Sequence, residues 1–342
     1  RSLRQFSTRV KATAPPGRSQ FFPLSTTNLA LKCHVVPNVD ANSGEFRLVP
    51  RDRHANRFAQ PHSRVPTMNC MEVWGGNCST DTCLTRPGID IWIQSDAGSA
   101  TMNGGSDIHL VSSCASGRIT RTLLADICAI GPMFSEVTST LRDLMKRNVN
   151  TIGQQRFVNQ MNQRLEERSE HGVFASALLS TYFAPTRTLS LCNAGHPPPL
   201  LYRYRTNSWS VVRGEQTAAA ASSSRPGVVD ASDYQQLQLK LETGDMVLSF
   251  SNSLTECRNA DGQTLGITGV LERVSQLDAS NPDEMIERLT RDLREEHSTN
   301  SGMDELTLFL CRATNTGVTW RDNVLAPLRL FRRVSDDTQI TG

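Results

Sequence analysis

Several features that define other classes of protein are missing from this 342-residue chain. No apolar run approaches the roughly 18 residues that a membrane-spanning helix needs, and no secretory signal is visible. The formal net charge is only +2, which argues against a nucleic-acid binder as a whole. With 38% hydrophobic and 20% charged residues, the chain can bury a sizeable core. We therefore expect a cytoplasmic protein that binds neither nucleic acid nor a membrane.

Cysteine pairs at metal-binding spacing are missing as well. The nine cysteines are an odd number, and no two of them form a CxxC motif. Cys78 and Cys83 lack a second pair at the spacing of a zinc site. Several other cysteines lie in apolar, strand-like segments, so we expect reduced thiols. The chain also has no Walker-type phosphate loop, no GxSxG and no HExxH, which removes three common routes to catalysis.

Acidic residues are absent from the first 39 positions. Residues 1–69 carry a net charge of +8, so the remainder carries −6. The chain begins with Arg, and two interpretations of this segment are open: a transit peptide, or a solvated basic arm, which we favour because hydrophobic periodicity is poor. We predict an irregular arm over 1–69, a central domain over 70–312 and a C-terminal tail over 313–342.

The hydrophobic period changes along the central domain and predicts an α+β fold. Helical spacing predicts two amphipathic helices over 134–149 and 157–165, and Asn281-Pro282 begins a third. The small-residue segment 216–229 is typical of a surface loop, and the tail holds a short basic amphipathic piece near 328–333. The predicted strands cover 89–93, 107–114, 119–127, 174–183, 188–192, 197–204, 208–213, 234–240, 246–251 and 306–311. Two sheets with helices packed outside would suit this order.

Acidic side chains or their amides stand at the ends of four of these strands. Asp107 opens one strand, Asp126 closes one, Asn252 follows one and Asp304 precedes one. Carboxylates that converge at one edge of a sheet can hold hard divalent cations such as Mg²⁺ or Mn²⁺. The same pattern is also typical of capping and turn residues, so position alone leaves both interpretations open.

Five short motifs stand in a fixed order around these residues. They are Gly105-Ser106-Asp107, Asp126–Gly131, Asn193–Tyr202, Ser251–Glu256 and Asp304–Thr307. Their order resembles the GGD, D-V-x-G-H-G, N-A-G-H-P-P, T-D-G-L-x-E and D-D-x-T motifs of the bacterial PPM-type serine/threonine phosphatases, SpoIIE-like group. The resemblance runs from about residue 100 to 312. Neither the residues nor the resemblance assigns a role to the Glu-Val-Trp-Gly-Gly-Asn segment at 72–77.

The resemblance implies a β-sandwich flanked by helices, with two metal ions, Mn²⁺ or Mg²⁺, at one edge. Asp126 would bridge the metals, with the carbonyl of Ile127 on one of them. Asp304 would ligate the first metal, Asn252 would occupy a further ligand position, and Asp107 would ligate a metal or orient its water. Such water, acidified by the metals, would attack phosphoserine or phosphothreonine. The implied substrate is a phosphorylated regulator in bacterial signal transduction, of the anti-sigma-factor antagonist class.

Four substitutions depart from the family's motifs. Asn252 replaces an Asp and removes a negative charge, Ser253 replaces a Gly that could use positive φ, Ala129-Ile130 replaces Gly-His, and Ser106 replaces the second Gly of GGD. We therefore expect a phosphatase, a hydrolase, with one weakened metal site. The alternative is a pseudophosphatase that binds a phosphoprotein and regulates it.

Overall fold

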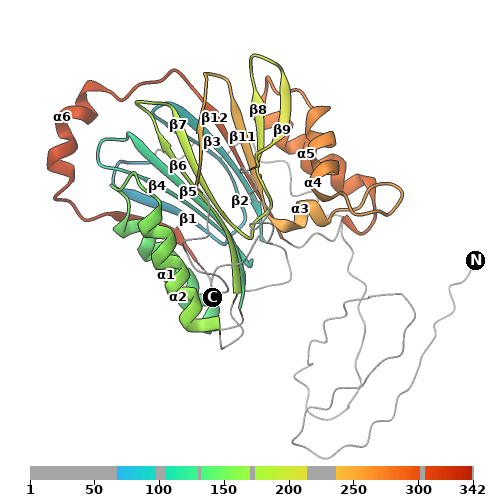
Figure 1. Ribbon diagram of the computed structural model, residues 1–342, viewed down its shortest axis with the longest axis horizontal. Helices are drawn as coiled ribbons and strands as arrows, with labels where there is room; N and C mark the ends of the chain where they lie inside the picture. The colour runs from blue at the N-terminus through green and yellow to red at the C-terminus, as the bar shows by residue number, and fades with distance from the viewer. Residues whose placement is uncertain are drawn as a thin grey trace, which may run out of the picture. The chain divides into compact units, whose positions relative to one another are not determined.

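The computed structural model describes residues 68–97, 105–129, 132–169, 174–213, 236–300 and 305–340. Outside these ranges lie residues 1–67 of the expected basic arm, the whole loop at 216–229, and Asp304. Within them, two β-sheets pack face to face and helices cover the two outer faces (Figure 1). This is the α+β sandwich that the sequence predicts.

The first sheet has seven strands, and its centre is buried on both faces. All seven residues of β4 are buried, although only Ile108, Leu110 and Val111 among them are apolar. The predicted hairpin is present: β4 and β5 pair antiparallel around a turn in which Gly117 has φ +70°. In spatial order the strands are β10 (Gln236–Lys240), β7 (Thr188–Ala194), β6 (Phe174–Phe183), β5 (Ile119–Cys128), β4 (Asp107–Ser113), β1 (Glu72–Gly76) and β13 (Ser335–Gln339).

The second sheet has six strands, and each pair of neighbouring strands in it is antiparallel. Its centre is β12, paired with β3 on one side and β11 on the other. In spatial order the strands are β2 (Thr80–Arg86), β3 (Ile89–Asp96), β12 (Leu306–Ala313), β11 (Met246–Phe250), β8 (Leu200–Arg203) and β9 (Ser208–Val211). The apolar residues between the sheets include Ile91, Leu124, Leu189 and Phe309.

The helices bury their apolar faces on the outer sides of the sheets. α1 (Pro132–Arg147) and α2 (Gln155–Ser169) cover the first sheet. The second sheet is covered by α3 (Asn252–Glu256), α4 (Gly266–Ser275) and α5 (Pro282–Glu296). The apolar side chains on both faces of the central strands thereby lose contact with water, which is the main stabilising contribution in such a layered fold.

A fully buried arginine ties the helical layer to the first sheet. Arg121, on β5, donates to the carbonyls of Asn148 and Thr151 in the connection between α1 and α2, and to Thr181 Oγ1 on β6. These carbonyls lie at a helix end, where backbone acceptors need partners. Burial lowers the pKa of Arg121 to about 10.

The C-terminal residues differ from the predicted tail. Residues 313–342 contain α6 (Trp320–Arg329) and β13, and β13 pairs in parallel with β1 at the edge of the first sheet. The pairing is close: a Cβ added at Gly76 would lie 1.7 Å from the carbonyl oxygen of Gln339. The expectation of a tail was therefore wrong for these two elements, since the last strand of the sandwich comes from this segment.

Two chemical features of the described ranges bear on the expectations above. The eight cysteines within them are free thiols, and Cys33 lies outside them. Among the helices of these ranges, none combines the length and the apolar character needed to cross a bilayer.

Candidate metal centre

Asp107 and Asp126 lie directly opposite each other on β4 and β5. The two strands are antiparallel, so the start of β4 and the end of β5 meet at the same edge of the first sheet. The hairpin alone therefore brings the two carboxylates together. Ile127 follows on β5, and its side chain is buried in the cluster beneath α1 and α2. Any part of Ile127 in a metal site would come from its backbone.

Asn252 reaches the same edge from the second sheet. It is the first residue of α3, two positions after the end of β11. Its Nδ2 donates a hydrogen bond of 3.1 Å to Asp126 Oδ2. Three of the four predicted side-chain ligands thus converge in space. The fourth, Asp304, lies outside the described residues, but its neighbour Glu305 reaches this edge too.

Ser106 connects the segments at this edge. Its backbone N–H donates to Glu305 Oε2 at 2.8 Å, and its hydroxyl also bonds to Glu305 Oε2. The same hydroxyl lies 3.4 Å from Asp126 Oδ1. The Ser106 carbonyl accepts from the Ile127 N–H at 3.1 Å. The serine that replaces a glycine of the family motif therefore fastens this loop to two acidic neighbours.

Asp107 is the most buried of these acids, with 6% of its surface exposed. Burial raises the pKa of Asp107 to about 7, against the opposing effect of a hydrogen bond from Ser251. The negative charges of Asp126 and Glu305 raise it further, and a hydrogen bond from Thr307 lowers it. Its Oδ2 has no hydrogen-bond partner in the described part of the chain. A buried carboxylate oxygen without a partner is a position that a cation would stabilise.

The residues at this edge fit a hard divalent cation in donor type, because the side chains that converge there offer carboxylate and amide oxygens. Their total negative charge suits a divalent cation less well, because Asn252 is neutral. Asn252 now turns its NH₂ group toward Asp126, and it would have to turn its oxygen inward to become a ligand. No group of three or more His, Cys, Asp or Glu side chains is arranged around a metal position among the described residues, which do not include Asp304.

Two of the other departures from the family motifs have simple structural consequences. Ser253 lies inside α3 and is not among the residues with positive φ, so its side chain does not strain the turn. Ala129 packs against the hydrophobic cluster under α1 and α2, while Ile130 lies outside the described residues. The expected restriction at Ser253 is therefore not present.

Sequence reasoning missed Asn77, which positions the loop before Asp107. The Asn77 side chain is 1% exposed, and its Nδ2 donates to the Gly105 carbonyl at 3.1 Å. The Asn77 carbonyl accepts from the Gly105 N–H at 3.0 Å. The preceding glycines allow this approach, since a Cβ at Gly75 would lie 2.1 Å from the carbonyl oxygen of His109. The Gly-Gly-Asn sequence could have drawn attention to Asn77. It does not indicate what the side chain binds, because that depends on which strand pairs with this segment.

The most specific motif of the sequence forms a turn at the end of β7. Asn193 Oδ1 accepts from the His196 N–H, and Asn193 Nδ2 donates to the His196 carbonyl, both at 2.9 Å. The His196 ring is buried, and burial lowers its pKa to about 4 against an opposing effect of the Pro197 backbone. Among the described residues, no group meets either ring nitrogen with the geometry of a hydrogen bond. Asn193, and not the His196 ring, therefore holds this turn.

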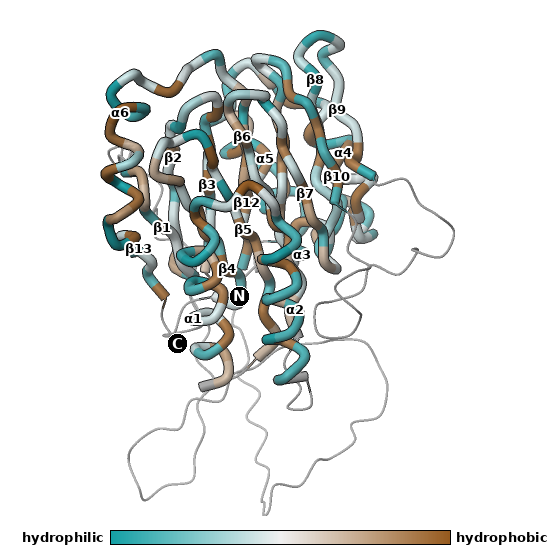
Figure 2. Tube along the Cα trace, turned by 60° about the vertical axis from the view of Figure 1, so that its left-hand side comes forward, coloured by the Kyte–Doolittle hydropathy of each residue, from teal (hydrophilic) through white to brown (hydrophobic). Residues whose placement is uncertain are grey.

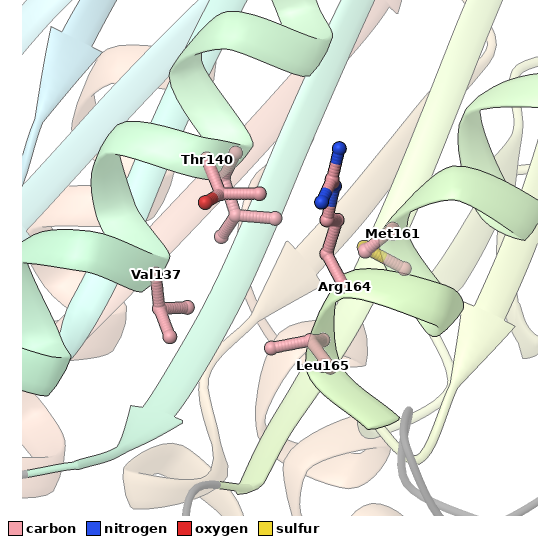
Figure 3. A pocket seen from close by; sticks show the side chains of 6 residues that line it. Val137, Thr140, Met161, Arg164 and Leu165 are labelled. Atoms are coloured by element: carbon pink, nitrogen blue, oxygen red, sulfur yellow. The ribbon is translucent and has the colours of Figure 1, made fainter. Parts of the chain in front are cut away.

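A small pocket between α1 and α2 is unrelated to the acidic residues (Figure 3). Apolar side chains and the stem of Arg164 line it, among them Val137, Met161 and Leu165. It has no room for a water-sized molecule. It therefore reflects imperfect helix packing, and we assign it no ligand.

Two packed sheets with helices outside form the fold of PP2C-type phosphatase domains. The model of the SpoIIE family, described as stage II sporulation protein E, matches residues 130–314. That is more than half of the chain, so the chain belongs to the SpoIIE family. This confirms the resemblance seen in the sequence.

Individual relatives are more distant. Phosphoserine phosphatase RsbU of Bacillus subtilis (strain 168) is 26% identical over 102 residues, which are 30% of this chain and 28% of RsbU. The RsbU and RsbW domains of Rv1364c from Mycobacterium tuberculosis match with a TM-score of 0.53 and 20% identity, over 68% of this chain and 63% of that chain. The PP2C phosphatase domain of Bacillus subtilis SpoIIE, with a fragment of its regulatory domain, matches with a TM-score of 0.53 and 14% identity, over 67% of this chain and 65% of that one. The chain thus spans less than a third of RsbU.

Proposed function

We propose that this chain is a metal-dependent phosphoprotein phosphatase that hydrolyses phosphoserine or phosphothreonine on a regulatory protein. The observation that carries the proposal is the facing pair of Asp107 and Asp126 at one sheet edge, in a member of the SpoIIE family. The relative RsbU, named a phosphoserine phosphatase, supports the substrate type. The RsbU and RsbW domains of the Mycobacterium protein support a regulatory partner, which we take to be of the anti-sigma-factor antagonist class.

The proposed metal ligands are Asp107, Asp126, the Ile127 carbonyl, Asn252 and Asp304, and the proposed metal is Mn²⁺ or Mg²⁺. When bound, divalent cations supply an acidified water and offset the negative charge of the phosphate. The role of the neighbouring residues is to position the ligands. Ser106 fixes Asp126 and Glu305 relative to each other. Asn77 fixes the loop in front of Asp107.

Asn252 limits this activity in our proposal. One unit charge at about 4 Å contributes roughly 4 kcal/mol at an effective dielectric of 20. Asn252 is half-buried, so solvent reduces this figure. Even half of it would weaken the affinity for a cation by about 30-fold. We therefore expect activity that needs a high metal concentration.

A second candidate is a pseudophosphatase that binds a phosphoprotein without cleaving it. The hydrogen bond from Asn252 to Asp126 favours this candidate, because it places a neutral donor beside the carboxylate that would bridge two metals. Metal-independent binding of a phosphopeptide would be its signature.

The experiment is a titration of Mn²⁺ against hydrolysis of an aryl phosphate and of a phosphoserine peptide. We expect hydrolysis that rises with Mn²⁺ into the millimolar range and is abolished by Asp126→Asn. The control is Asp261→Asn, which removes an exposed acid outside the candidate centre and should leave hydrolysis unchanged. Absence of hydrolysis at a Mn²⁺ concentration where calorimetry shows bound metal would reject the enzyme and favour the pseudophosphatase.

A further inference from the structure

The helix α6 carries an apolar stripe that no residue of the described ranges covers. Trp320 is 78% exposed, Leu328 is 67% exposed and Phe331, just beyond the helix, is 90% exposed. Val324 lies between them and is also exposed. The spacing of four residues puts Trp320, Val324 and Leu328 on one face of α6, and Phe331 follows three positions later. Figure 2 shows hydrophobic and hydrophilic residues alternating along α6, away from the other helices.

The opposite face of α6 is anchored to the domain. Arg118, in the turn between β4 and β5, donates to Asn323 Oδ1 at 2.6 Å. Arg329 pairs with Asp322 at 2.6 Å and lies 3.4 Å from the Ala115 carbonyl. The helix also has a side-chain cap, because Thr319 accepts from the Asp322 N–H. The apolar stripe is therefore held outward by contacts on the inner face.

The charges around the stripe favour an anionic surface. Arg321, Arg332 and Arg333 are exposed, and none of them pairs with an acid in the described part of the chain. Basic residues beside an exposed Trp, Leu and Phe stripe are typical of helices that lie in the headgroup region of a bilayer. The same arginines disfavour the chain's own basic arm, residues 1–69, as the cover of this face.

A second copy of the chain is a poorer occupant than a membrane. A stable protein interface buries about 800 Å² on each partner and uses about 20–30 residues a side. The stripe on α6 offers only a handful of side chains. A lipid surface has no such minimum, since each inserted side chain adds to the partition free energy.

The position of α6 leaves the acidic edge free. α6 contacts the turn after β4, whereas Asp107 lies at the start of that strand, about 20 Å away along six residues. In both views α6 lies apart from α3, which carries Asn252 (Figures 1 and 2). A surface bound through α6 would not block a protein substrate at the other end.

We propose that α6 and the following residues to Arg333 bind the surface of an anionic membrane. Trp320, Leu328 and Phe331 insert among the headgroups, and the arginines contact lipid phosphates. The sequence led us to expect no membrane contact, because it holds no spanning segment; a helix that lies on a bilayer needs none. This proposal is independent of the phosphatase activity.

The test is sedimentation of the full chain with vesicles of phosphatidylcholine, alone or with about 30% phosphatidylglycerol. We expect binding to the anionic vesicles that weakens as salt is added. Phe331→Glu should weaken it by at least about tenfold, and Arg332→Glu with Arg333→Glu should remove the preference for anionic lipid. Trp320 fluorescence should shift to the blue on binding, and a Trp320→Phe variant should lose that shift.

The matched control is Ile152→Glu, which adds the same charge at an apolar residue that is 51% exposed in the α1–α2 connection. It should bind vesicles like the unaltered chain, and circular dichroism should show that each variant is folded. Three results would overturn the proposal: no binding to anionic vesicles, equal binding of Phe331→Glu and the unaltered chain, or a dimer in light scattering that Phe331→Glu dissociates. The second result would assign lipid binding to another part of the chain, and the third would assign the stripe to a second copy.

Discussion

The substitution Asn252→Asp tests the candidate centre with and without metal. In EDTA it places a second carboxylate where the Asn252 amide now donates to Asp126 at 3.1 Å. At that distance and an effective dielectric of 20, two unit charges repel by about 5 kcal/mol. Both side chains are half-buried, so screening reduces the repulsion to roughly 1–2 kcal/mol. The lost hydrogen bond adds about 1 kcal/mol.

The variant should therefore be less stable in EDTA and more responsive to metal. A loss of about 2–3 kcal/mol corresponds to a fall in Tm of roughly 4–12 °C for a domain of this size. Added Mn²⁺ should reverse the loss, because a cation between two carboxylates removes the repulsion. The apparent affinity for Mn²⁺ should rise by at least about tenfold, which is about 1.4 kcal/mol. If the phosphatase proposal holds, hydrolysis at low Mn²⁺ should rise with it.

Thermal unfolding by circular dichroism, in EDTA and across a Mn²⁺ series, measures both effects. The control is the exchange Asp126→Asn with Asn252→Asp, which keeps one carboxylate and one amide at the two positions. It should melt near the unaltered chain in EDTA and gain little from Mn²⁺. If Asn252→Asp melts like the unaltered chain in EDTA and responds no more strongly to Mn²⁺, the two side chains do not face a common cation and the reasoning fails.

Three further predictions concern the residues around this edge. Burial raises the pKa of Asp107 to about 7, so the metal-free protein should lose stability as the pH rises from about 4 through 7. Asp107→Asn should therefore raise Tm in EDTA by about 5 °C or more at pH 8 but not at pH 4. An equal gain in Tm at both pH values would contradict this. Asn77→Ala leaves the buried Gly105 carbonyl without its side-chain donor and should cost about 1–3 kcal/mol in urea unfolding. Arg121→Met should cost about 3 kcal/mol or more, because it leaves the Asn148 and Thr151 carbonyls without donors, and an unchanged urea midpoint would refute that role.

Local pairing could be predicted from the sequence, because it depends on neighbours in the chain. β4 and β5 are two strand-like segments joined by a short turn, and their hairpin alone determines that Asp107 faces Asp126. The two long helices were equally clear, since a sustained apolar period fixes which face is buried. The family motifs then gave the order of the remaining segments.

Distant pairing could not be predicted in the same way. β13 is a Ser-Asp-Asp-Thr-Gln strand at the edge of its sheet, with four of its five residues exposed, so it has no apolar alternation. It is a strand because β1, more than 250 residues earlier, offers an unpaired edge. β1 contains Gly75 and Gly76, which approach the backbones of the neighbouring strands closely. Because glycine has no side chain, these positions add nothing to a hydrophobic pattern, and the sequence of β1 does not alternate.

The contacts of Asp126 could not be predicted from the motifs alone. Asn252 and Ser106 are two separate departures from the family pattern, nearly 150 positions apart, yet they meet at this one carboxylate. Asn252 donates to its Oδ2, and the Ser106 hydroxyl lies 3.4 Å from its Oδ1. Asn252 therefore supplies a neutral donor to one oxygen of Asp126, while the single hydroxyl proton of Ser106 is directed to Glu305 Oε2. A metal would have to displace the Asn252 contact as well as bind with one ligand charge fewer. For this reason we expect a higher metal requirement than the loss of charge at Asn252 alone would produce.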